Sequence, residues 1–290
     1  MALIPVSERL SFPMTTHALH AVVRAALDED GAFNDVTTMA TVPADRRSRG
    51  AIVARAKGVV CGMPLAVEAF RLLDPRVTIH VEHDDGAHVE AGTQVLLVDG
   101  NARGLLSAER VALNYLQRLS GVATLTAAYV AAVAGTSATI LDTRKTTPGW
   151  RALEKYAVRA GGGSNYRMDL TSAVLIKDNH LAAMDGDVAK AVQRARELAP
   201  AGVPIEVECD RIDQVDAALG AGVEIILLDN MSLDDMSACV RRTAGRAKLE
   251  ESGGVTLTSV RAIADTGVDF ISVGALTHSA PALDLGLDFA

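Results

Sequence analysis

From about residue 137 onward the chain repeats one pattern: a short apolar run, a polar cluster, and then a stretch whose apolar residues have helical spacing. The apolar runs are TSATIL, SAVLI, PIEVE, EIILL, AKLEE and DFISV. Four successive runs end at Glu208, Asp229, Glu251 and Val273, which are about 21 or 22 residues apart. A repeat this short predicts parallel strands, each joined to the next by one helix.

The near-continuous apolar character of these runs indicates strands buried on both faces, as in an α/β barrel or a doubly wound sheet. We favour the barrel, because a doubly wound dinucleotide-binding sheet would carry a GxGxxG after its first strand, and the chain has none. In such barrels the carboxyl ends of the strands hold the functional groups. The charged residues of this chain follow the strands at those ends.

The first hundred or so residues have a different character. After a helical pattern around HALHAVVRAALDEDG come stretches in which apolar and polar residues alternate, separated by Gly and Asp-Gly turns. These stretches are RGAIVARAKGVVCG, RVTIHVEHDDGAHVEAG and TQVLLVDG. They predict an antiparallel sheet with a few helices. The Ala- and Leu-rich stretch SAERVALNYLQRLSGVATLTAAYVAAVAG then predicts one or two bridging helices.

Composition narrows the classes of partner. With 28 basic and 36 acidic side chains the net charge is −8, which disfavours nucleic acid, and 3% aromatic residues provide few stacking platforms. The three cysteines are widely spaced and form no CxxC, so we expect neither disulfides nor a zinc site. The start MALIPVSERLSF lacks a secretory pattern, and no apolar run is long enough to span a bilayer. We therefore expect a cytoplasmic protein without a membrane partner.

Two segments of the chain carry clusters of basic residues. DTRKTTPGW places Arg144 and Lys145 directly after a strand, where a guanidinium and an ammonium can receive carboxylate or phosphate oxygens. The segment RAGGGSNYR adds Arg167 after three glycines that permit close backbone approach to a ligand. Lys177 ends another strand, and it either faces an anionic ligand or forms a salt bridge to Glu208 or Asp229.

Glu208 and Asp229 each end a strand, one βα unit apart. Two carboxylates at a barrel mouth can hold Mg²⁺ or accept hydrogen bonds from sugar hydroxyls, or they can serve only as counter-ions for the nearby cations. Glu206 faces the same side of its strand as Glu208, so the sequence leaves open which of the two is the ligand.

Two turns of small residues follow the last two predicted strands. SGGV spans residues 252–255, and GALTHS spans residues 274–279. Backbone N–H groups in turns at this position of a barrel commonly bind phosphate, although tight turns without a ligand would have the same composition.

The motifs ERVALNYLQRLSGVAT, DTRKTTPGWRALEKYAVRAGGGSNYR, LIKDNH, IEVECD, LLDN, ESGG and FISVGALTHS, in this order, strongly resemble quinolinate phosphoribosyltransferase. The resemblance covers essentially the whole chain, including EDGAFNDVTT. It implies an N-terminal α/β sandwich (1–112), an open, roughly seven-stranded α/β barrel (113–279) and a C-terminal tail (280–290) that returns to the N-terminal domain. It also implies the reaction of quinolinate and phosphoribosyl pyrophosphate with Mg²⁺ to give nicotinate mononucleotide, pyrophosphate and carbon dioxide, as a step of NAD biosynthesis.

Residue roles follow from the same resemblance. Arg144, Lys145, Arg167 and Lys177 would hold the quinolinate carboxylates and part of the donor, and Glu208 and Asp229 would hold the ribose hydroxyls and Mg²⁺. Arg110 resembles an arginine that completes the pocket across a homodimer interface, and higher oligomers remain open. We take Lys145, Glu208 and Asp229 as the catalytic residues. The remaining substrate contacts implied are Thr143, Tyr166, Ser252, Gly253, Gly254, Val273, Gly274 and Ala275.

One residue departs from the family pattern, because Tyr166 stands where members commonly have histidine. A phenol can donate a hydrogen bond but carries no positive charge near neutral pH. The alternative functions are a related pyrophosphorylase with another anionic acceptor, a Schiff-base aldolase that uses Lys177, and a non-catalytic phosphate- or nucleotide-binding barrel.

Overall fold

The computed structural model of the chain describes residues 10–289. The N-terminal segment in which the sequence shows no secretory pattern lies largely outside the described residues. Ala290, the last residue of the predicted tail, also lies outside them. The described residues form two compact units. One comprises residues 10–127, Thr147–Gly162 and residues 279–289, and we call it the sandwich unit; the other, the barrel unit, comprises Ala128–Thr146 and Gly163–His278.

The cut that the sequence suggested near residue 279 agrees with these units, because residues 279–289 belong to the sandwich unit, whereas the cut near residue 112 does not. The bridging stretch is a single helix, α4 (Ala102–Ala132), most of which belongs to the sandwich unit, as does α5 (Arg151–Ala160). Arg118 of α4 forms an ion pair with Glu154 of α5 at 2.8 Å, and a Cβ at Gly161 would lie 2.3 Å from the Ala123 carbonyl oxygen. This close packing of α5 on α4 is why residues 147–162 join the sandwich unit.

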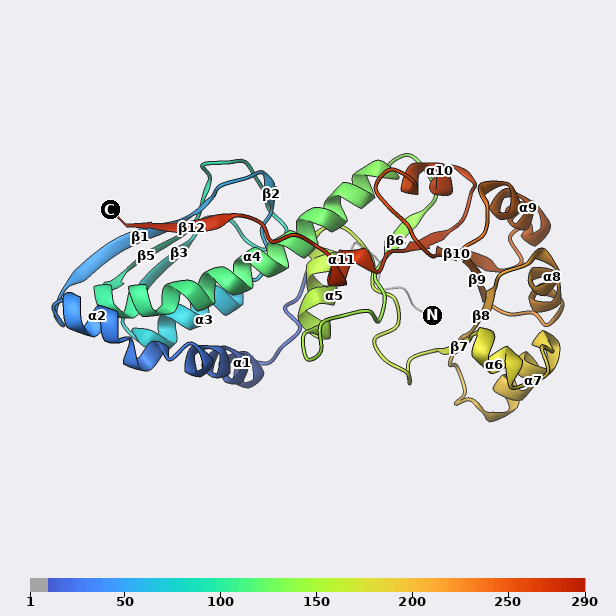
Figure 1. Cartoon of the computed structure of the whole chain (residues 1–290), viewed down its shortest axis with the longest axis horizontal. Helices are drawn as coiled ribbons and strands as arrows, with labels where there is room; N and C mark the ends of the chain where they lie inside the picture. The colour runs from blue at the N-terminus through green and yellow to red at the C-terminus, as the bar shows by residue number, and fades with distance from the viewer. Residues whose placement is uncertain (1–9, 290) are drawn as a thin grey trace. The chain divides into compact units, whose positions relative to one another are not determined.

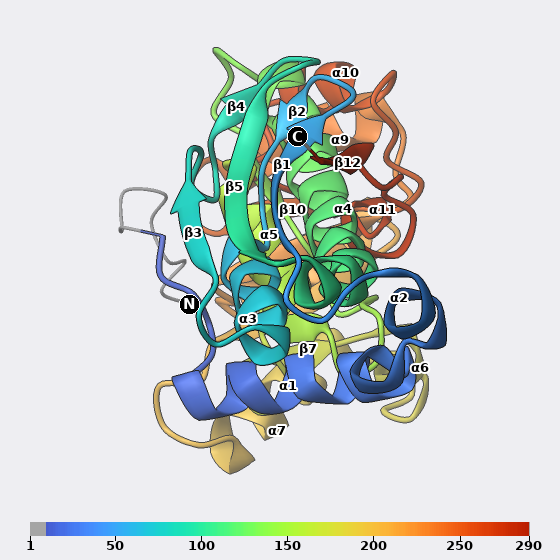
Figure 2. The same ribbon diagram turned by 90° about the vertical axis from the view of Figure 1, so that its left-hand side faces the viewer.

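The sandwich unit contains an antiparallel sheet in the order β12 (Leu285–Phe289), β1 (Arg47–Ala54), β5 (Gln94–Asn101) and β3 (Thr78–Val81), so the last strand of the chain lies beside β1. Figure 2 shows β1, β5 and β3 side by side. The remaining pair, β2 and β4, forms a separate two-stranded sheet. The elements are α1 (Thr16–Glu29), η1 (Ala32–Asn34), α2 (Val36–Thr41), β1 (Arg47–Ala54), β2 (Gly58–Val59), α3 (Met63–Leu73), β3 (Thr78–Val81), β4 (His88–Val89), β5 (Gln94–Asn101), α4, α5 and β12 (Leu285–Phe289).

Local sequence explains the ends and faces of these elements. Thr15 caps α1 by accepting a hydrogen bond from the Ala18 N–H at 3.3 Å, and Val23 and Leu27, four residues apart, form its buried stripe. On β1, Ile52 and Ala54 are fully buried, whereas Arg47 and Arg49 on the alternate face are exposed. The helices α3 and α4 run along one side of this sheet in Figure 1.

The barrel unit confirms all six strands expected from the repeat. Its elements are β6 (Thr139–Leu141), β7 (Val174–Ile176), α6 (Asp178–Ala182), α7 (Val188–Leu198), β8 (Ile205–Cys209), α8 (Ile212–Gly220), β9 (Ile225–Asp229), α9 (Leu233–Thr243), β10 (Lys248–Ser252), α10 (Val260–Asp265), β11 (Phe270–Ser272) and α11 (Ala275–His278). The parallel sheet has the order β6-β11-β10-β9-β8-β7.

This strand order identifies a barrel. The last strand, β11, pairs with the first, β6, so the strands follow one another around a ring instead of reversing direction as in a doubly wound sheet. A parallel bridge between Leu141 and Ser164 extends the ring beyond β6, and no further pairing joins Ser164 to β7 within the described residues. The fold is therefore an open α/β barrel together with an N-terminal α/β sandwich, as predicted.

Register shows which side chains face the barrel interior. Ser252 pairs with Asp229 and Ser272, and Ser272 pairs with Leu141, so these four residues form one layer. Leu141, Phe270 and the neighbouring Tyr166 form a buried apolar cluster. Across the described part of the chain, no helix is both long and apolar enough to span a membrane.

Candidate active site

The barrel unit contains every site residue predicted from the sequence except Arg110. Arg110 lies exposed on α4 in the part that belongs to the sandwich unit. The others follow or end the parallel strands, at the carboxyl edge of the sheet. They are Thr143, Arg144, Lys145, Tyr166, Arg167, Lys177, Glu208, Asp229, Ser252, Gly253, Gly254, Val273, Gly274 and Ala275.

Asp142 organises the two basic clusters. This fully buried residue follows β6, and its carboxylate accepts hydrogen bonds from the Asn165 side chain at 2.6 Å and from the Tyr166 backbone N–H at 2.9 Å. One carboxylate thus joins the loop that carries Arg144 to the loop that carries Arg167. Segments more than twenty residues apart in the sequence are held together at one edge of the barrel.

Lys145 is placed by the last turn of the barrel. Its carbonyl accepts a hydrogen bond from the Thr277 hydroxyl at 2.8 Å, and a Cβ at Gly274 would lie 3.1 Å from its Cδ. The side chain therefore passes against Gly274, next to the small-residue turn predicted to bind phosphate. A larger residue at 274 would displace the lysine.

Arg167 is a buried cation with 8% of its surface exposed. Its Nη1 donates to the Ala173 carbonyl at 2.9 Å, and its guanidinium lies 5.7 Å from the centre of the Tyr166 ring. Its Nε has no hydrogen-bond partner among the described residues. Burying a cation with unused donors is costly unless an anion completes its surroundings, so this side chain is suited to a bound anion.

Lys177 forms the salt bridge that the sequence offered as one of its alternatives. Its Nζ lies 2.5 Å from Glu208 Oε2. The backbone N–H of Lys177 donates to His180 Nδ1 at 3.0 Å, which fixes the start of α6. The pair lies at the partly exposed ends of β7 and β8, where an anionic ligand or a cation can exchange with either partner.

The end of β9 is shaped by Asn230. Its side chain donates to Asp229 Oδ2 at 3.0 Å, and a Cβ at Gly253 would lie 2.3 Å from Asn230 Oδ1. Gly253 also has φ of +126°, a conformation that glycine adopts readily. Only glycine therefore fits at this position, and its backbone lies directly beside the residue that orients Asp229.

Glu206 and Glu208 have different surroundings. Glu206 is 2% exposed and accepts a hydrogen bond from the Tyr166 hydroxyl at 2.5 Å, whereas Glu208 is at the rim with Lys177. Burial raises the pKa of Glu206, and the Tyr166 hydroxyl and the Arg167 charge oppose that rise. Burial and the Glu206 carboxylate raise the pKa of Glu250 on β10 well above its usual range. The Ser272 hydroxyl donates to Glu250 at 2.5 Å.

A third buried carboxyl group, Glu251, lies near Asp229. Burial, reinforced by the charge of Asp229, raises the pKa of Glu251 to about 8. Its Oε2 has no hydrogen-bond partner among the described residues. Glu251 is therefore predominantly protonated at neutral pH.

A cluster of three or more His, Cys, Asp or Glu side chains that could hold a metal ion is not found in residues 10–289. Glu208 and Asp229 provide two carboxylates at adjacent strand ends. This donor set suits Mg²⁺, which commonly takes one or two carboxylates and fills its remaining positions with water and substrate phosphate oxygens.

Four residues that shape the site were not predicted from the sequence: Asn230, Glu250, Ser272 and Thr277. The two consecutive glutamates within the strand AKLEE were an available signal, because an acidic residue in a buried strand requires a polar partner. Nothing comparable marked Ser272 or Thr277, since their partners come from distant segments.

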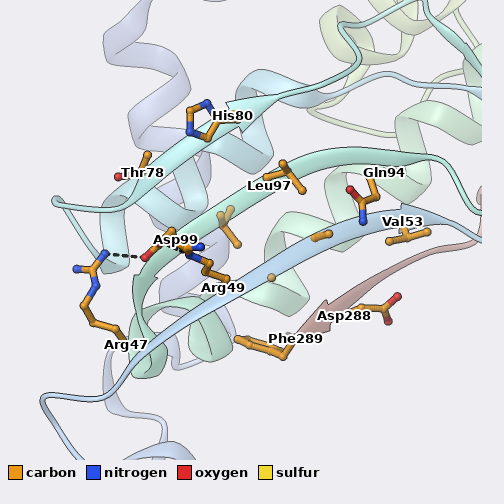
Figure 3. Close-up of a pocket in the computed structure, with 13 residues that line it drawn as sticks. Arg47, Arg49, Val53, Thr78, His80, Gln94, Leu97, Asp99, Asp288 and Phe289 are labelled. Carbon is orange, nitrogen blue, oxygen red and sulfur yellow. Dashed lines mark hydrogen bonds and ion pairs between the residues drawn. The ribbon is translucent and has the colours of Figure 1, made fainter.

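A hollow of about 630 Å³ lies elsewhere, on the open face of the sandwich sheet. Figure 3 shows Arg47 and Arg49 beside Asp99 on this face. The two arginines share the single carboxylate of Asp99, at 2.7 and 2.6 Å, so one of their two positive charges is compensated. The chemistry expected from the sequence belongs to the barrel unit and not to this face.

Comparisons with known proteins match both the N-terminal and the C-terminal part of the chain to one family. Residues 35–120 match the family model described as "Quinolinate phosphoribosyl transferase, N-terminal domain", and residues 122–288 match the corresponding C-terminal domain. The "Nicotinate-nucleotide pyrophosphorylase [carboxylating]" of Mycobacterium leprae is 48% identical over 279 residues, covering 93% of this chain and 97% of the relative.

Two further relatives extend the agreement. The "Probable nicotinate-nucleotide pyrophosphorylase [carboxylating]" of Bacillus subtilis is 42% identical over 260 residues, covering 90% of this chain and 89% of the relative. The solved nicotinate-nucleotide pyrophosphorylase of Francisella tularensis superposes with a TM-score of 0.90 at 38% identity, covering 97% of this chain and 99% of that structure. With its barrel, its rim of cations and carboxylates and these matches to both domains, the chain belongs to the quinolinate phosphoribosyltransferase family.

Proposed function

We propose that this chain transfers the phosphoribosyl group of phosphoribosyl pyrophosphate to the ring nitrogen of quinolinate, with loss of carbon dioxide. The products are nicotinate mononucleotide and pyrophosphate, and the reaction serves NAD biosynthesis. One observation carries the proposal: cations from three separate segments, with Asp142 tying two of them together, follow the carboxyl ends of one barrel that also presents Glu208 and Asp229.

The charges of the two substrates explain why so many cations are needed. Quinolinate carries two carboxylates and the donor several phosphate charges, and each pair of like charges at about 4 Å costs about 1 kcal/mol in water and several times more in a shielded pocket. Arg144, Lys145, Arg167 and Lys177 would offset this repulsion. Arg167, buried and with an unused Nε, suits a carboxylate, because a guanidinium binds carboxylate oxygens in a planar geometry.

The carboxylates serve the step at the sugar. Departure of pyrophosphate leaves positive charge on the ribose ring, and Glu208 and Asp229 would stabilise that charge and accept hydrogen bonds from the ribose hydroxyls. Once the ring nitrogen of quinolinate is quaternised, it stabilises the carbanion that remains after the adjacent carboxylate is lost. These steps require no covalent intermediate with the chain.

Magnesium and the donor phosphates would be held at neighbouring positions. Glu208 and Asp229 would bind Mg²⁺, which when bound neutralises charge on the departing pyrophosphate. The turns at 252–254 and 273–275 would contact the 5′-phosphate through backbone N–H groups. Lys145 lies against Gly274 and would add a positive charge there.

The decisive assay mixes the purified chain with quinolinate, phosphoribosyl pyrophosphate and Mg²⁺ and measures carbon dioxide and nicotinate mononucleotide. Each component is omitted in turn, and nicotinate replaces quinolinate in a parallel reaction. We expect both products only in the complete mixture with quinolinate. Turnover of nicotinate in place of quinolinate would indicate a related pyrophosphorylase with another acceptor. Binding of the substrates without product would indicate a non-catalytic phosphate- or nucleotide-binding barrel.

Two variants test the residues. Lys145→Ala and Arg167→Ala should each abolish turnover while leaving the circular dichroism spectrum unchanged. Near-normal kinetics in both variants would show that the site has been assigned to the wrong residues.

We further propose a homodimer in which Arg110 of one chain completes the site of the other. The support is the family resemblance and the exposed position of Arg110 on α4. Arg110→Ala and Lys145→Ala chains are each inactive in this arrangement, but mixing and re-equilibrating them in equal amounts should restore about a quarter of wild-type activity, since half of the dimers would contain one intact site. Absence of recovery, despite subunit exchange, would place Arg110 in the site of its own chain or outside it.

A cytoplasmic location is also proposed. All three cysteines are unpaired and buried, which suits a reducing compartment. Fractionation of cells that produce the chain, with a cytoplasmic marker enzyme as reference, tests this location. Recovery in the membrane or secreted fraction would refute it.

A further inference from the structure

The barrel interior contains a row of buried polar side chains that the proposed reaction does not use directly. Tyr166 follows the Ser164 bridge, Glu206 lies on β8, Glu250 on β10 and Ser272 on β11. All four are at least nine-tenths buried. The Tyr166 hydroxyl donates to Glu206 at 2.5 Å, and the Ser272 hydroxyl donates to Glu250 at 2.5 Å.

The two glutamates face each other across the row. Burial raises the pKa of each, and the Glu206 carboxylate contributes to the rise for Glu250. A hydrogen bond between the two side chains lowers the pKa of Glu206 and raises that of Glu250, so Glu250 is the partner that holds the proton and donates it to Glu206. Hydroxyl donors are therefore supplied at the two outer ends of the row, and the carboxyl groups meet in the middle.

Arg167 is the nearby cation whose positive charge favours the ionised forms of Glu206 and Glu250. Its charge opposes the pKa rise of both Glu206 and Glu250, and its guanidinium lies 5.7 Å from the centre of the Tyr166 ring. The backbone of the same loop is fixed by Asp142 through the Tyr166 N–H. Arg167 is thus restrained by the chain before it, by the Ala173 carbonyl that its Nη1 binds and by the aromatic ring beside it.

We propose that Tyr166 is a positioning residue, whose hydroxyl, anchored on Glu206, fixes its ring beside the Arg167 guanidinium and so orients that guanidinium toward the acceptor carboxylate. The inference rests on the proposed function and assigns Tyr166 an indirect role in place of a direct substrate contact. The geometry favours this role, because a hydroxyl that already donates to a buried carboxylate at 2.5 Å has no second hydrogen to offer a substrate.

The primary test is Tyr166→Phe, which removes the hydroxyl and keeps the ring. Loss of one hydrogen bond to a charged group predicts a rise of about tenfold in the KM for quinolinate. The KM for phosphoribosyl pyrophosphate should stay within about twofold, because Tyr166 acts on the acceptor arginine alone. Calorimetric titration with quinolinate should show the same weakening without turnover.

Tyr156→Phe is the matched control. Tyr156 donates to the partly buried Asp85 at 2.8 Å, in the sandwich unit and outside the proposed site. Both variants lose one phenol-to-carboxylate hydrogen bond, so both should be destabilised to a similar degree. Only Tyr166→Phe should change the KM for quinolinate.

A double-mutant cycle with Glu206→Gln distinguishes an indirect role from a direct one. If Tyr166 acts through Glu206, adding Tyr166→Phe to Glu206→Gln should change the KM for quinolinate by less than about twofold. Independent, multiplicative effects of the two changes would mean that Tyr166 contacts the substrate itself. An unchanged KM in Tyr166→Phe would mean that the ring only packs. Either result would overturn the inference while leaving wild-type turnover, and with it the proposed function, intact.

Discussion

Glu154 offers the sharpest test of how the loop after β6 is held in place. This carboxylate on α5 is fully buried and accepts three hydrogen bonds: from Arg118 at 2.8 Å, from the Thr147 hydroxyl at 2.8 Å and from the Thr147 backbone N–H at 2.9 Å. Thr147 lies only two residues after Lys145. The glutamate therefore connects α4, α5 and Thr147, at the end of the loop that follows β6.

The substitution Glu154→Gln keeps the shape of the side chain but removes its charge and one acceptor. Whichever way the glutamine amide is oriented, its NH₂ group faces a donor whose hydrogen bond the Glu154 carboxylate accepts. Losing a charged hydrogen bond costs about 1.5–3 kcal/mol, and leaving a buried donor unpaired costs about 1–3 kcal/mol more. Because Arg118 is 27% exposed and can recover some hydration, we expect a total of about 3 kcal/mol.

Urea unfolding followed by circular dichroism measures this cost. At a slope of about 3 kcal/mol per molar, the midpoint should fall by about 1 M. Asp216→Asn is the control, because Asp216 and Arg242 form a pair at 2.8 Å in which both side chains are about half exposed. Its loss should cost less than about 1 kcal/mol. If Glu154→Gln lowered the urea midpoint no more than Asp216→Asn does, the hydrogen bonds of the Glu154 carboxylate would not be what holds this loop.

Three further predictions concern packing, pH and the loop junction. Gly121→Ala should lower the melting temperature in calorimetry although alanine normally favours helices by about 1 kcal/mol, because the new Cβ would lie 2.1 Å from the Pro281 carbonyl oxygen; an unchanged or higher value would contradict this packing. Glu251, with its pKa raised from 4.5 to about 8, holds in the folded state a proton that the unfolded chain releases, so its contribution to stability falls as pH rises from about 4.5 to about 8. Glu251→Gln should therefore raise the urea midpoint relative to wild type at pH 8 and much less at pH 5, and an equal change at both values would refute the shift. Asp142→Asn should lower kcat/KM for quinolinate by at least tenfold, because an amide cannot accept both hydrogen bonds that join the two basic loops; unchanged kinetics would show that this junction is dispensable.

The repeat in the sequence predicted the barrel well because its signal is local. Each strand is a short apolar run, each helix has its own spacing, and the polar residue that ends a strand is next to it in the chain. Glu208, Asp229 and Lys177 could therefore be placed at the carboxyl edge of the sheet from the sequence. The prediction of one or two bridging helices was less precise, because a local pattern does not show whether a helix is interrupted. The structure has the single helix α4 there.

The contacts between distant segments could not be read in this way. Whether Lys177 would pair with Glu208 or Asp229 depended on strand positions, and the structure places Glu208 Oε2 at 2.5 Å. The different settings of Glu206 and Glu208 likewise depend on Tyr166, which is forty residues away in the sequence from Glu206. The grouping of α5 with the sandwich unit depends on the packing of Gly161 against α4.

The order of side chains along the chain was enough to determine the alternation of strands and helices, the chemical character of the strand ends and the family. Pairing between strands and between loops, which only the tertiary structure decided, determined which carboxylates are buried, which cations are paired and where the compact units divide. The physical reason is that secondary-structure patterning depends on neighbours within a few residues, whereas the burial and partner of an ionisable group depend on atoms brought close by the whole fold.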